Sequence, residues 1–289
     1  MPECLPVDYG HARRFATREA RRIAGDLYPG PVLMPRGLLR GLDPILAVAL
    51  GPALEGRESF HLAFENMLRG RPDGPLLLAL WSSATSGEIP QEDLRRILKR
   101  MPVPMPESPA TRGELLAYLH PRASTLARCT LALAQRLEPE ALAPAERLAC
   151  GFVVTRLLTD LPKHLAAGKL HLPLSDLEKA GLSREELFGM VRTPAVDRFL
   201  LMECEWARDL LRQGLPVCER VGARLQRGLR AAVLRAEMLL RRVRKPDNDI
   251  FRNPPTLTNS ERWRCAVRAW RPIKAKSIPQ SDSSSAPLS

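Results

Sequence analysis

The sequence contains few aromatic residues and few of the β-branched runs from which sheets are built. Phe, Trp and Tyr make up 5% of the 289 residues, and Leu and Ala supply most of the 45% that are hydrophobic. A β-sandwich or barrel needs runs of Val, Ile, Thr and Tyr, so this deficit argues against both. Because Leu, Ala, Arg and Glu favour helices, the composition predicts an all-α fold.

Several motifs of catalysis and membrane insertion are also absent. No GxGxxG, Walker or GxSxG motif occurs, which argues against dinucleotide, P-loop and α/β-hydrolase chemistry. No apolar run approaches the ~20 residues that span a bilayer, and no signal-peptide core is present. No CxxC occurs, so we interpret the cysteines as free thiols, several of them in the core. They are Cys4, Cys129, Cys150, Cys204, Cys218 and Cys265.

Positive charge is in clear excess. The 44 Lys and Arg residues outnumber 32 Asp and Glu residues, giving a formal charge of +12. This favours an anionic partner, although an arginine-rich solvated surface explains the same composition. The densest stripe is a candidate for contact with an anionic membrane surface. Aromatic residues do not interleave with it, which argues against nucleic acid as a partner. The candidate residues are Arg227, Arg230, Arg241, Arg242, Arg244 and Lys245.

Two further charged regions each allow both a functional and a purely structural interpretation. Residues 11–27 form a basic helix, and the arginines between 13 and 22 give it a weak resemblance to a mitochondrial targeting segment, diluted by acidic residues. We interpret residues 1–15 as an N-terminal extension. Glu203, Glu205 and Asp209 alternate with Arg208 and Arg212, and this spacing predicts a solvated, ion-paired helix face.

Apolar periodicity predicts a series of helices joined by short connectors. Residues 101–110 carry four prolines and are expected to be extended, whereas Thr111 with Glu114, and Ser183 with Glu186, are typical helix starts. Residues 246–272 are predicted to form a loop and a short helix, followed by a disordered Ser-rich tail over 273–289. The expected helices cover residues 37–54, 58–69, 75–84, 111–120, 122–137, 144–160, 194–213 and 216–244.

One stretch is more specific than its composition. It reads Asp160-Leu161-Pro162-Lys163-His164, then Gly168-Lys169-Leu170-His171-Leu172-Pro173, then Gly181-Leu182-Ser183. This resembles the second signature of the squalene/phytoene synthase family, in which an RDxxED motif continues through G-R-x-Y-L-P into a short helix. Residues 34–35, 69–72 and 111–118 resemble further family segments in the same order. The resemblance implies one helical bundle of the isoprenoid (terpenoid) synthase type over residues 16–245.

The family's chemistry depends on Mg²⁺ held by two aspartate-rich motifs on facing helices. The metal binds a prenyl diphosphate and assists loss of its diphosphate. In this sequence the first motif's aspartates fall on Ala53, Leu54 and Arg57, and in the second motif only Asp160 remains. Because neighbouring cations repel a metal ion, the resemblance implies neither catalytic residues nor a metal or other cofactor. The candidate pocket residues are Arg156, Asp160, Lys163, His164, Lys169 and His171.

The C-terminal region resembles one branch of the family. Asp249-Ile250-Phe251, with Trp270-Arg271 about twenty residues later, is similar to the mitochondrial branch that assists assembly of NADH dehydrogenase (complex I) and also lacks the aspartates. This implies a non-catalytic protein that binds complex I subunits or other assembly factors. Its expected location is the matrix side of the inner mitochondrial membrane in a eukaryote, and the cytoplasm or the membrane periphery in a bacterium.

Two alternatives remain open. The first is a Mg²⁺-dependent prenyl-diphosphate transferase of isoprenoid biosynthesis with a rearranged metal site. The second is a binding module for an isoprenoid or a prenyl diphosphate, in which Arg156, Lys163 and Lys169 replace Mg²⁺ as counter-charges.

Overall fold

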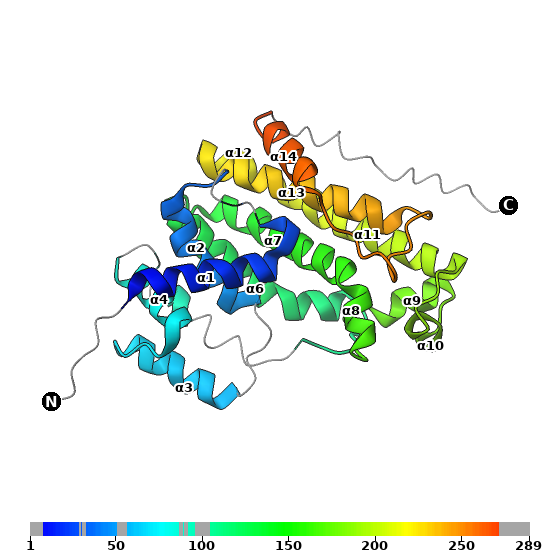
Figure 1. Cartoon of the computed structure of the whole chain (residues 1–289), viewed down its shortest axis with the longest axis horizontal. Helices are drawn as coiled ribbons and strands as arrows, with labels where there is room; N and C mark the ends of the chain where they lie inside the picture. Colours follow the sequence, from blue (N-terminus) through cyan, green and yellow to red (C-terminus); the bar gives the residue numbers. More distant parts are fainter. Residues whose placement is uncertain are drawn as a thin grey trace.

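The fold is a bundle of helices. The computed structural model describes residues 8–28, 30, 33–50, 57–86, 89, 92–95 and 105–271, and this part contains no strand. The longest helices run along the long axis of the molecule, with α9 and α10 at one end and α3 and α4 at the other (Figure 1). The all-α prediction is therefore confirmed.

The helices follow one another in a single series, joined by short connectors. They are α1 (Tyr9–Ala24), η1 (Gly25–Leu27), α2 (Arg36–Leu50), α3 (Arg57–Leu68), α4 (Gly74–Thr85), α6 (Arg112–Leu133), α7 (Pro139–Thr159), α8 (Leu161–Ala166), α9 (Leu174–Ala180), α10 (Arg184–Phe188), α11 (Pro194–Gly214), α12 (Val217–Arg220), α13 (Ala223–Arg244) and α14 (Asn259–Arg268). The Ser-rich tail expected at 273–289 lies outside the described residues.

Helix α7 lies at the centre of the core, packed against α6, α11 and α13. Its approach to α11 depends on a glycine, because a Cβ added at Gly214 would lie 2.5 Å from the backbone nitrogen of Leu148. A side chain there would force the two helices apart, at a cost typical of overpacking a core. The end of α7 carries Asp160 and lies beside α8, close to this packed core.

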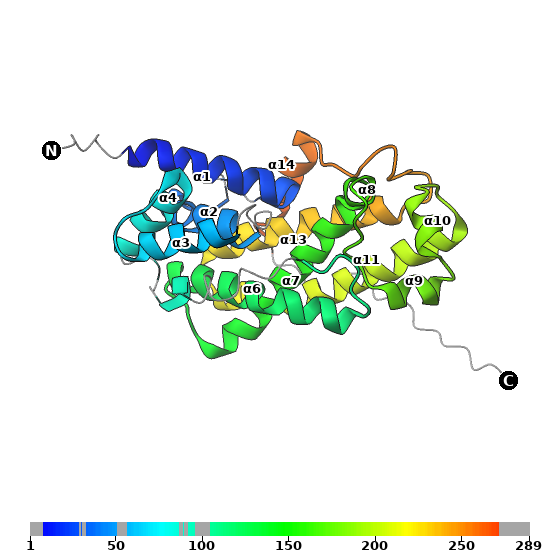
Figure 2. The ribbon, with the colours of Figure 1, turned by 90° about the horizontal axis from the view of Figure 1, so that it is seen from below.

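Helix α1 lies across α2 and α4 (Figure 2). Asp8 caps its first turn by accepting a hydrogen bond from the backbone nitrogen of His11 at 2.8 Å. Ala12, Ala16 and Ala20 recur every fourth residue and are buried, so small side chains form the contact face. The arginines of α1 lie outside this face and are exposed.

Three expected helix boundaries are wrong. The helix expected at 144–160 begins earlier, at Pro139, and continues through Pro144 as α7. Residues 111–120 and 122–137 form one helix, α6, which continues through Pro121 and ends at Leu133. The long segment expected at 216–244 instead divides into α12 and α13, because Val221 is extended at the junction. The capping box of Ser183 and Glu186 is confirmed at the start of α10.

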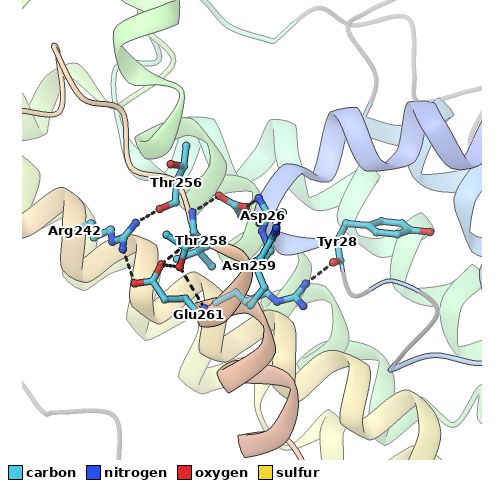
Figure 3. A network of polar contacts seen from close by, with 10 residues as sticks. Asp26, Tyr28, Arg242, Thr256, Thr258, Asn259 and Glu261 are labelled. Carbon is cyan, nitrogen blue, oxygen red and sulfur yellow. Dashed lines mark hydrogen bonds and ion pairs between the residues drawn. The ribbon is translucent and has the colours of Figure 1, made fainter.

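The C-terminal part of the bundle is fastened to its N-terminal part. Asp26 accepts hydrogen bonds from the backbone nitrogen of Leu257 at 2.9 Å and from Nη2 of Arg262 at 2.5 Å. We call Asp26, Leu257 and Arg262 the C-terminal clasp (Figure 3). Nearby, Arg242 pairs with Glu261 at 2.5 Å and fixes α14 on α13.

No helix in the described part of the chain combines the length and the apolar character needed to cross a bilayer.

Candidate functional site

The residues of the second motif gather where α7 passes into α8. Asp160 is the C-cap of α7, and its Oδ2 lies 2.9 Å from Nη2 of Arg156, one helical turn earlier. Burial raises the pKa of Asp160, while the charges of Arg156 and Lys163 lower it and offset part of that effect. The carboxylate that the family would use for Mg²⁺ is therefore already in an ion pair.

Two histidines complete this cluster. The rings of His164 and His171 meet edge to face with their centroids 5.0 Å apart, and Nδ1 of His171 lies 2.9 Å from the carbonyl oxygen of Pro106. Burial, the neighbouring His171 and the surrounding cations lower the pKa of His164 to about 4. His164 is therefore neutral at neutral pH and does not add to the positive charge at this site.

The two lysines predicted for the pocket lie at its edge. Lys169 is exposed and its Nζ lies 3.4 Å from Oε1 of Glu107. Lys163 is also exposed, although its charge acts on both Asp160 and His164. The structure thus brings together Arg156, Asp160, His164 and His171, and leaves the lysines toward solvent.

The donor set does not fit Mg²⁺. This ion prefers several oxygen ligands, with carboxylates as the protein's contribution. Among the described residues, no group of three or more His, Cys, Asp or Glu side chains is placed to hold a metal ion. The positions aligned with the first motif, Ala53 and Leu54, lie outside the described residues, as does the side chain of Arg57. The sequence supplies no carboxylate at any of these three positions.

A second candidate site lies between α1 and α2 and was missed in the sequence. It is a cleft of about 730 Å³, a volume typical of ligand pockets. Its wall contains six arginines and one carboxylate, Asp43, a formal balance of +5. We call it the arginine cleft, and its arginines are Arg13, Arg14, Arg18, Arg21, Arg36 and Arg40.

A buried polar network lies beside these arginines. Asp43 accepts hydrogen bonds from the hydroxyl groups of Thr17 at 2.6 Å and Tyr28 at 2.9 Å. Burial raises the pKa of Asp43, and the hydrogen bonds from Thr17 and Tyr28 partly offset this. Burial and the adjacent Asp43 likewise raise the pKa of Tyr28. This network fixes the facing sides of α1 and α2, so the cleft has a rigid floor.

None of the cleft's arginines forms an ion pair with a described residue, although the charge of Arg14 lowers the pKa of Asp8 and that of Arg21 lowers the pKa of Asp43. Arg13 donates to the hydroxyl of Ser82 at 3.2 Å, and Arg21 lies over the ring of Tyr28 at 5.5 Å. Arg14, Arg36 and Arg40 form no ion pair with any residue that the structure describes. Like charges held close together repel one another, and a multiply charged anion between them would reduce this repulsion.

The two sites are joined through Arg156. Its Nη1 would lie 2.5 Å from a Cβ placed on Gly25, the residue that ends α1 at φ +55°. Arg156 therefore occupies the space that a side chain at this turn would fill. The end of the helix that lines the cleft is thus in contact with the degenerate second motif.

The basic stripe predicted on α13 is largely engaged within the protein. Arg242 pairs with Glu261 at 2.5 Å, Arg244 with Glu205 at 3.0 Å, and Lys245 with Asp247 at 3.4 Å. Arg227 stacks on Trp270 at 3.9 Å. Arg230 and Arg241 have no ion-pair partner among the described residues.

The solvated acidic face predicted on α11 is wrong for Glu203. Its side chain is fully buried, next to Asp176 and 3.4 Å from Nη2 of Arg112. Burial and a hydrogen bond with Asp176 raise the pKa of Glu203 well above its usual value. Glu205 and Asp209 do pair with Arg208 and Arg212, each at about one helical turn, but Arg208 is buried and also pairs with Glu237 at 3.2 Å, so the prediction of a solvated face is wrong for Arg208 as well.

The arginine cleft could not be predicted from the sequence because its two walls lie on separate helices, α1 and α2. Arg14, Arg18 and Arg21 follow helical spacing, as do Arg36 and Arg40, so each wall is an arginine-lined helix face. The signal on α1 is present in the sequence, but it also fits a targeting segment. Only the packing of α1 on α2 turns two basic faces into one site.

Comparison with known sequences identifies relatives of the chain. Residues 49–271 match the model of the squalene/phytoene synthase family. A phytoene synthase from Thermus thermophilus is 28% identical over 231 residues, covering 74% of this chain and 76% of that protein. A bifunctional CrtB/UppS protein from Streptomyces coelicolor is 32% identical over 121 residues, 42% of this chain, and the match spans only 22% of that protein.

Comparison with solved structures addresses the fold. A dehydrosqualene synthase in complex with ligand superposes with a TM-score of 0.76 at 16% identity, covering 90% of this chain and 96% of that one. The squalene synthase HpnC from Alicyclobacillus acidocaldarius gives 0.68 at 20% identity, covering 83% and 95%. The predicted isoprenoid synthase type of bundle is confirmed by these structures. With a family model that matches most of its length, the chain belongs to the squalene/phytoene synthase family.

Proposed function

We propose that this protein is a non-catalytic member of its family that binds a prenyl diphosphate through arginine side chains instead of Mg²⁺. The observation that carries the proposal is the arginine cleft, whose lining contains six arginines and a single buried carboxylate. Guanidinium groups bind phosphate oxygens with two parallel hydrogen bonds and keep their charge at any physiological pH. The family membership supports an isoprenoid diphosphate as the phosphorylated ligand.

The second motif supports the absence of catalysis. Departure of a diphosphate is assisted by positive charge that stabilises the developing negative charge of the leaving group, which the family obtains from Mg²⁺ held by paired carboxylates. Here Arg156 neutralises Asp160, and two of the family's acidic positions are Lys163 and His164.

The decisive experiment compares binding with turnover. Titration calorimetry with farnesyl and geranylgeranyl diphosphate in EDTA should show binding, and farnesol should not bind. With Mg²⁺ added, a pyrophosphate-release assay should show no turnover. Pyrophosphate release above background would overturn the non-catalytic role, and the absence of binding in EDTA would overturn the ligand.

A variant pair locates the binding site. Arg36→Gln with Arg40→Gln should weaken binding at least ~10-fold, because two charge-assisted contacts are lost. Arg71→Gln is the matched control, since Arg71 lies on the turn before α4 and is not part of the cleft. Equal affinities for the double variant and the wild-type chain would place the ligand elsewhere.

The alternative, a Mg²⁺-dependent prenyltransferase, is supported by the names of the relatives, which include a phytoene synthase. It predicts turnover in the assay above and loss of ligand binding in EDTA. The two candidates therefore give opposite results in both measurements.

The narrower role in complex I assembly is supported only by the C-terminal resemblance. Within the fold, Ile250 of the Asp249-Ile250-Phe251 motif is fully buried, so packing also explains this motif. Affinity purification of the tagged chain from its source cells, after fractionation, tests the role and the proposed location together. Recovery of complex I subunits from a mitochondrial inner-membrane fraction is the expected outcome, and their absence from the purified material would contradict it.

A further inference from the structure

Helix α14 presents an apolar face to solvent. Trp263, Val267 and Trp270 are 60%, 56% and 64% exposed, although large apolar side chains are usually covered. Their spacing of four and three residues places them on one side of the helix and its final turn. The opposite side is buried, where Ala266 and Ala269 pack with Leu33 and Ala231. Within the part of the chain that the structure describes, this exposed face forms an apolar stripe that no other apolar side chain covers.

Arginines border this stripe. Arg264, Arg268 and Arg271 are exposed and form no ion pair within the part of the chain that the structure describes. On the α13 side, the guanidinium of Arg227 lies 3.9 Å from the ring centroid of Trp270. The single acidic residue of α14, Glu261, is bound by Arg242 and by the backbone nitrogen of Thr258. The stripe and its border therefore carry uncompensated positive charge.

The helix is held so that this face cannot turn inward. Arg262 pairs with Asp26, and Glu261 pairs with Arg242, each at 2.5 Å (Figure 3). A capping box of Thr258 and Glu261 fixes its first turn. The two tryptophans are therefore presented on a rigid support, which lowers the conformational entropy lost on docking.

We propose that the face formed by Trp263, Val267 and Trp270 docks into the headgroup layer of an anionic membrane. Indole rings favour this layer because one edge is apolar while the N–H can reach water or a phosphate. Arginines beside the apolar side chains bind anionic headgroups, the arrangement typical of interfacial helices. A protein partner would more often cover such a stripe with matched acidic residues, whereas lipid phosphate supplies the complementary charge uniformly. This surface is separate from the arginine cleft and does not depend on the prenyl diphosphate proposal.

Vesicle flotation of the full chain tests the inference. Binding should be weak on phosphatidylcholine vesicles and strong when phosphatidylglycerol is included, and salt should weaken it. Trp263→Ser with Trp270→Ser should reduce partitioning at least ~10-fold on anionic vesicles, because two indole anchors are lost. Arg264→Gln with Arg268→Gln should remove most of the preference for anionic vesicles. Leu62→Ser is the control, since Leu62 is 62% exposed on α3, away from the stripe.

Further measurements distinguish membrane docking from misfolding, from loss of the cleft ligand and from dimerisation. Circular dichroism should show unchanged melting of the variants, because the substituted side chains are exposed. Prenyl diphosphate binding by the tryptophan variant should equal that of the wild-type chain, which keeps the two proposals distinguishable. Failure of the wild-type chain to float with anionic vesicles would overturn the inference. Concentration-dependent dimerisation in sedimentation that the tryptophan variant abolishes would also overturn it, because a second copy would then cover the stripe.

Discussion

The guanidinium of Arg156 lies 2.9 Å from the carboxylate of Asp160, and the same side chain fills the space above Gly25. One arginine thereby neutralises the remaining acidic position of the second motif and contacts the end of the helix that lines the arginine cleft. The ionised side chains of this motif are therefore mainly cationic, whereas those of a Mg²⁺ centre are carboxylates. Several consequences of this arrangement can be measured.

Restoring acidic residues in the second motif alone should not restore catalysis. In Lys163→Glu with His164→Asp, we expect no pyrophosphate release from farnesyl diphosphate and Mg²⁺, because the sequence still has Ala53 and Leu54 at the aspartate positions of the first motif. The Thermus thermophilus phytoene synthase provides the positive control. Turnover by the double variant would mean that one motif is sufficient.

Gly25→Ala should destabilise the protein by about 1–3 kcal/mol, because a positive φ strains an alanine and its Cβ would collide with Arg156. Urea unfolding followed by circular dichroism measures the change in the free energy of unfolding. In the double variant Gly25→Ala with Arg156→Ala, the free energy of unfolding should recover only by the amount that the collision with Arg156 had cost. Gly37→Ala is the control, since a Cβ at Gly37 meets nothing within 4 Å.

His164 should make the protein less stable in acid. Its pKa is lowered from 6.5 to about 4 in the folded state, so the unfolded chain binds its proton first as the pH falls. The free energy of unfolding should therefore decrease as the pH falls from about 6.5 to about 4. His164→Gln should flatten this part of the curve in urea titrations at several pH values. His61→Gln, on the exposed surface of α3, is the control substitution.

Glu203 should make the free energy of unfolding depend on pH in the direction opposite to that of His164. Its Oε2 is buried and accepts no hydrogen bond from the residues that the structure describes, whereas a proton on the side chain can be shared with Asp176. Because its pKa is raised above the usual 4.5 by burial, the folded protein holds this proton to a higher pH than the unfolded chain does. The contribution to stability should therefore fall as the pH rises above about 4.5.

Glu203→Gln tests this, because an amide reproduces the neutral acid. The variant should fold normally, and its stability relative to the wild-type chain should increase from about pH 5 toward neutral pH, as expected for a buried group that must otherwise lose its proton. Glu203→Ala should be clearly destabilised at every pH, since it leaves Arg112 without this partner and creates a cavity. The exposed Glu219→Gln serves as the control. A parallel pH profile for Glu203→Gln and wild type would contradict the assignment.

The sequence predicted those parts of the fold that depend on local signals. Ser183 and Glu186 form their capping box, and the segment from Asp160 to Pro173, which contains α8, leads into the short helix α9 as the family signature implies. Pro121 shows the limit of such reasoning. Its missing N–H predicts a helix break, but α6 continues because Leu119 and Ala123 on either side are buried in the core. Tertiary packing outweighs the local preference there.

The sites were less predictable because they depend on pairs distant in sequence. Glu203 resembles its exposed neighbours until Asp176 and Arg112, contributed by other helices, are placed beside it. The arginines of α1 and α2 become one cleft only through the contact of these two helices. Helical periodicity identifies which face a residue belongs to, but it does not identify what that face meets.

The C-terminal clasp makes the order of synthesis matter for this fold. Asp26 emerges early from the ribosome, whereas its partners lie 231 and 236 residues further along the chain. Contacts of such long sequence separation close late. Until almost the entire chain has been made, the end of α1 lacks these partners, so a prematurely terminated product would leave this end of the arginine cleft open to proteases and chaperones.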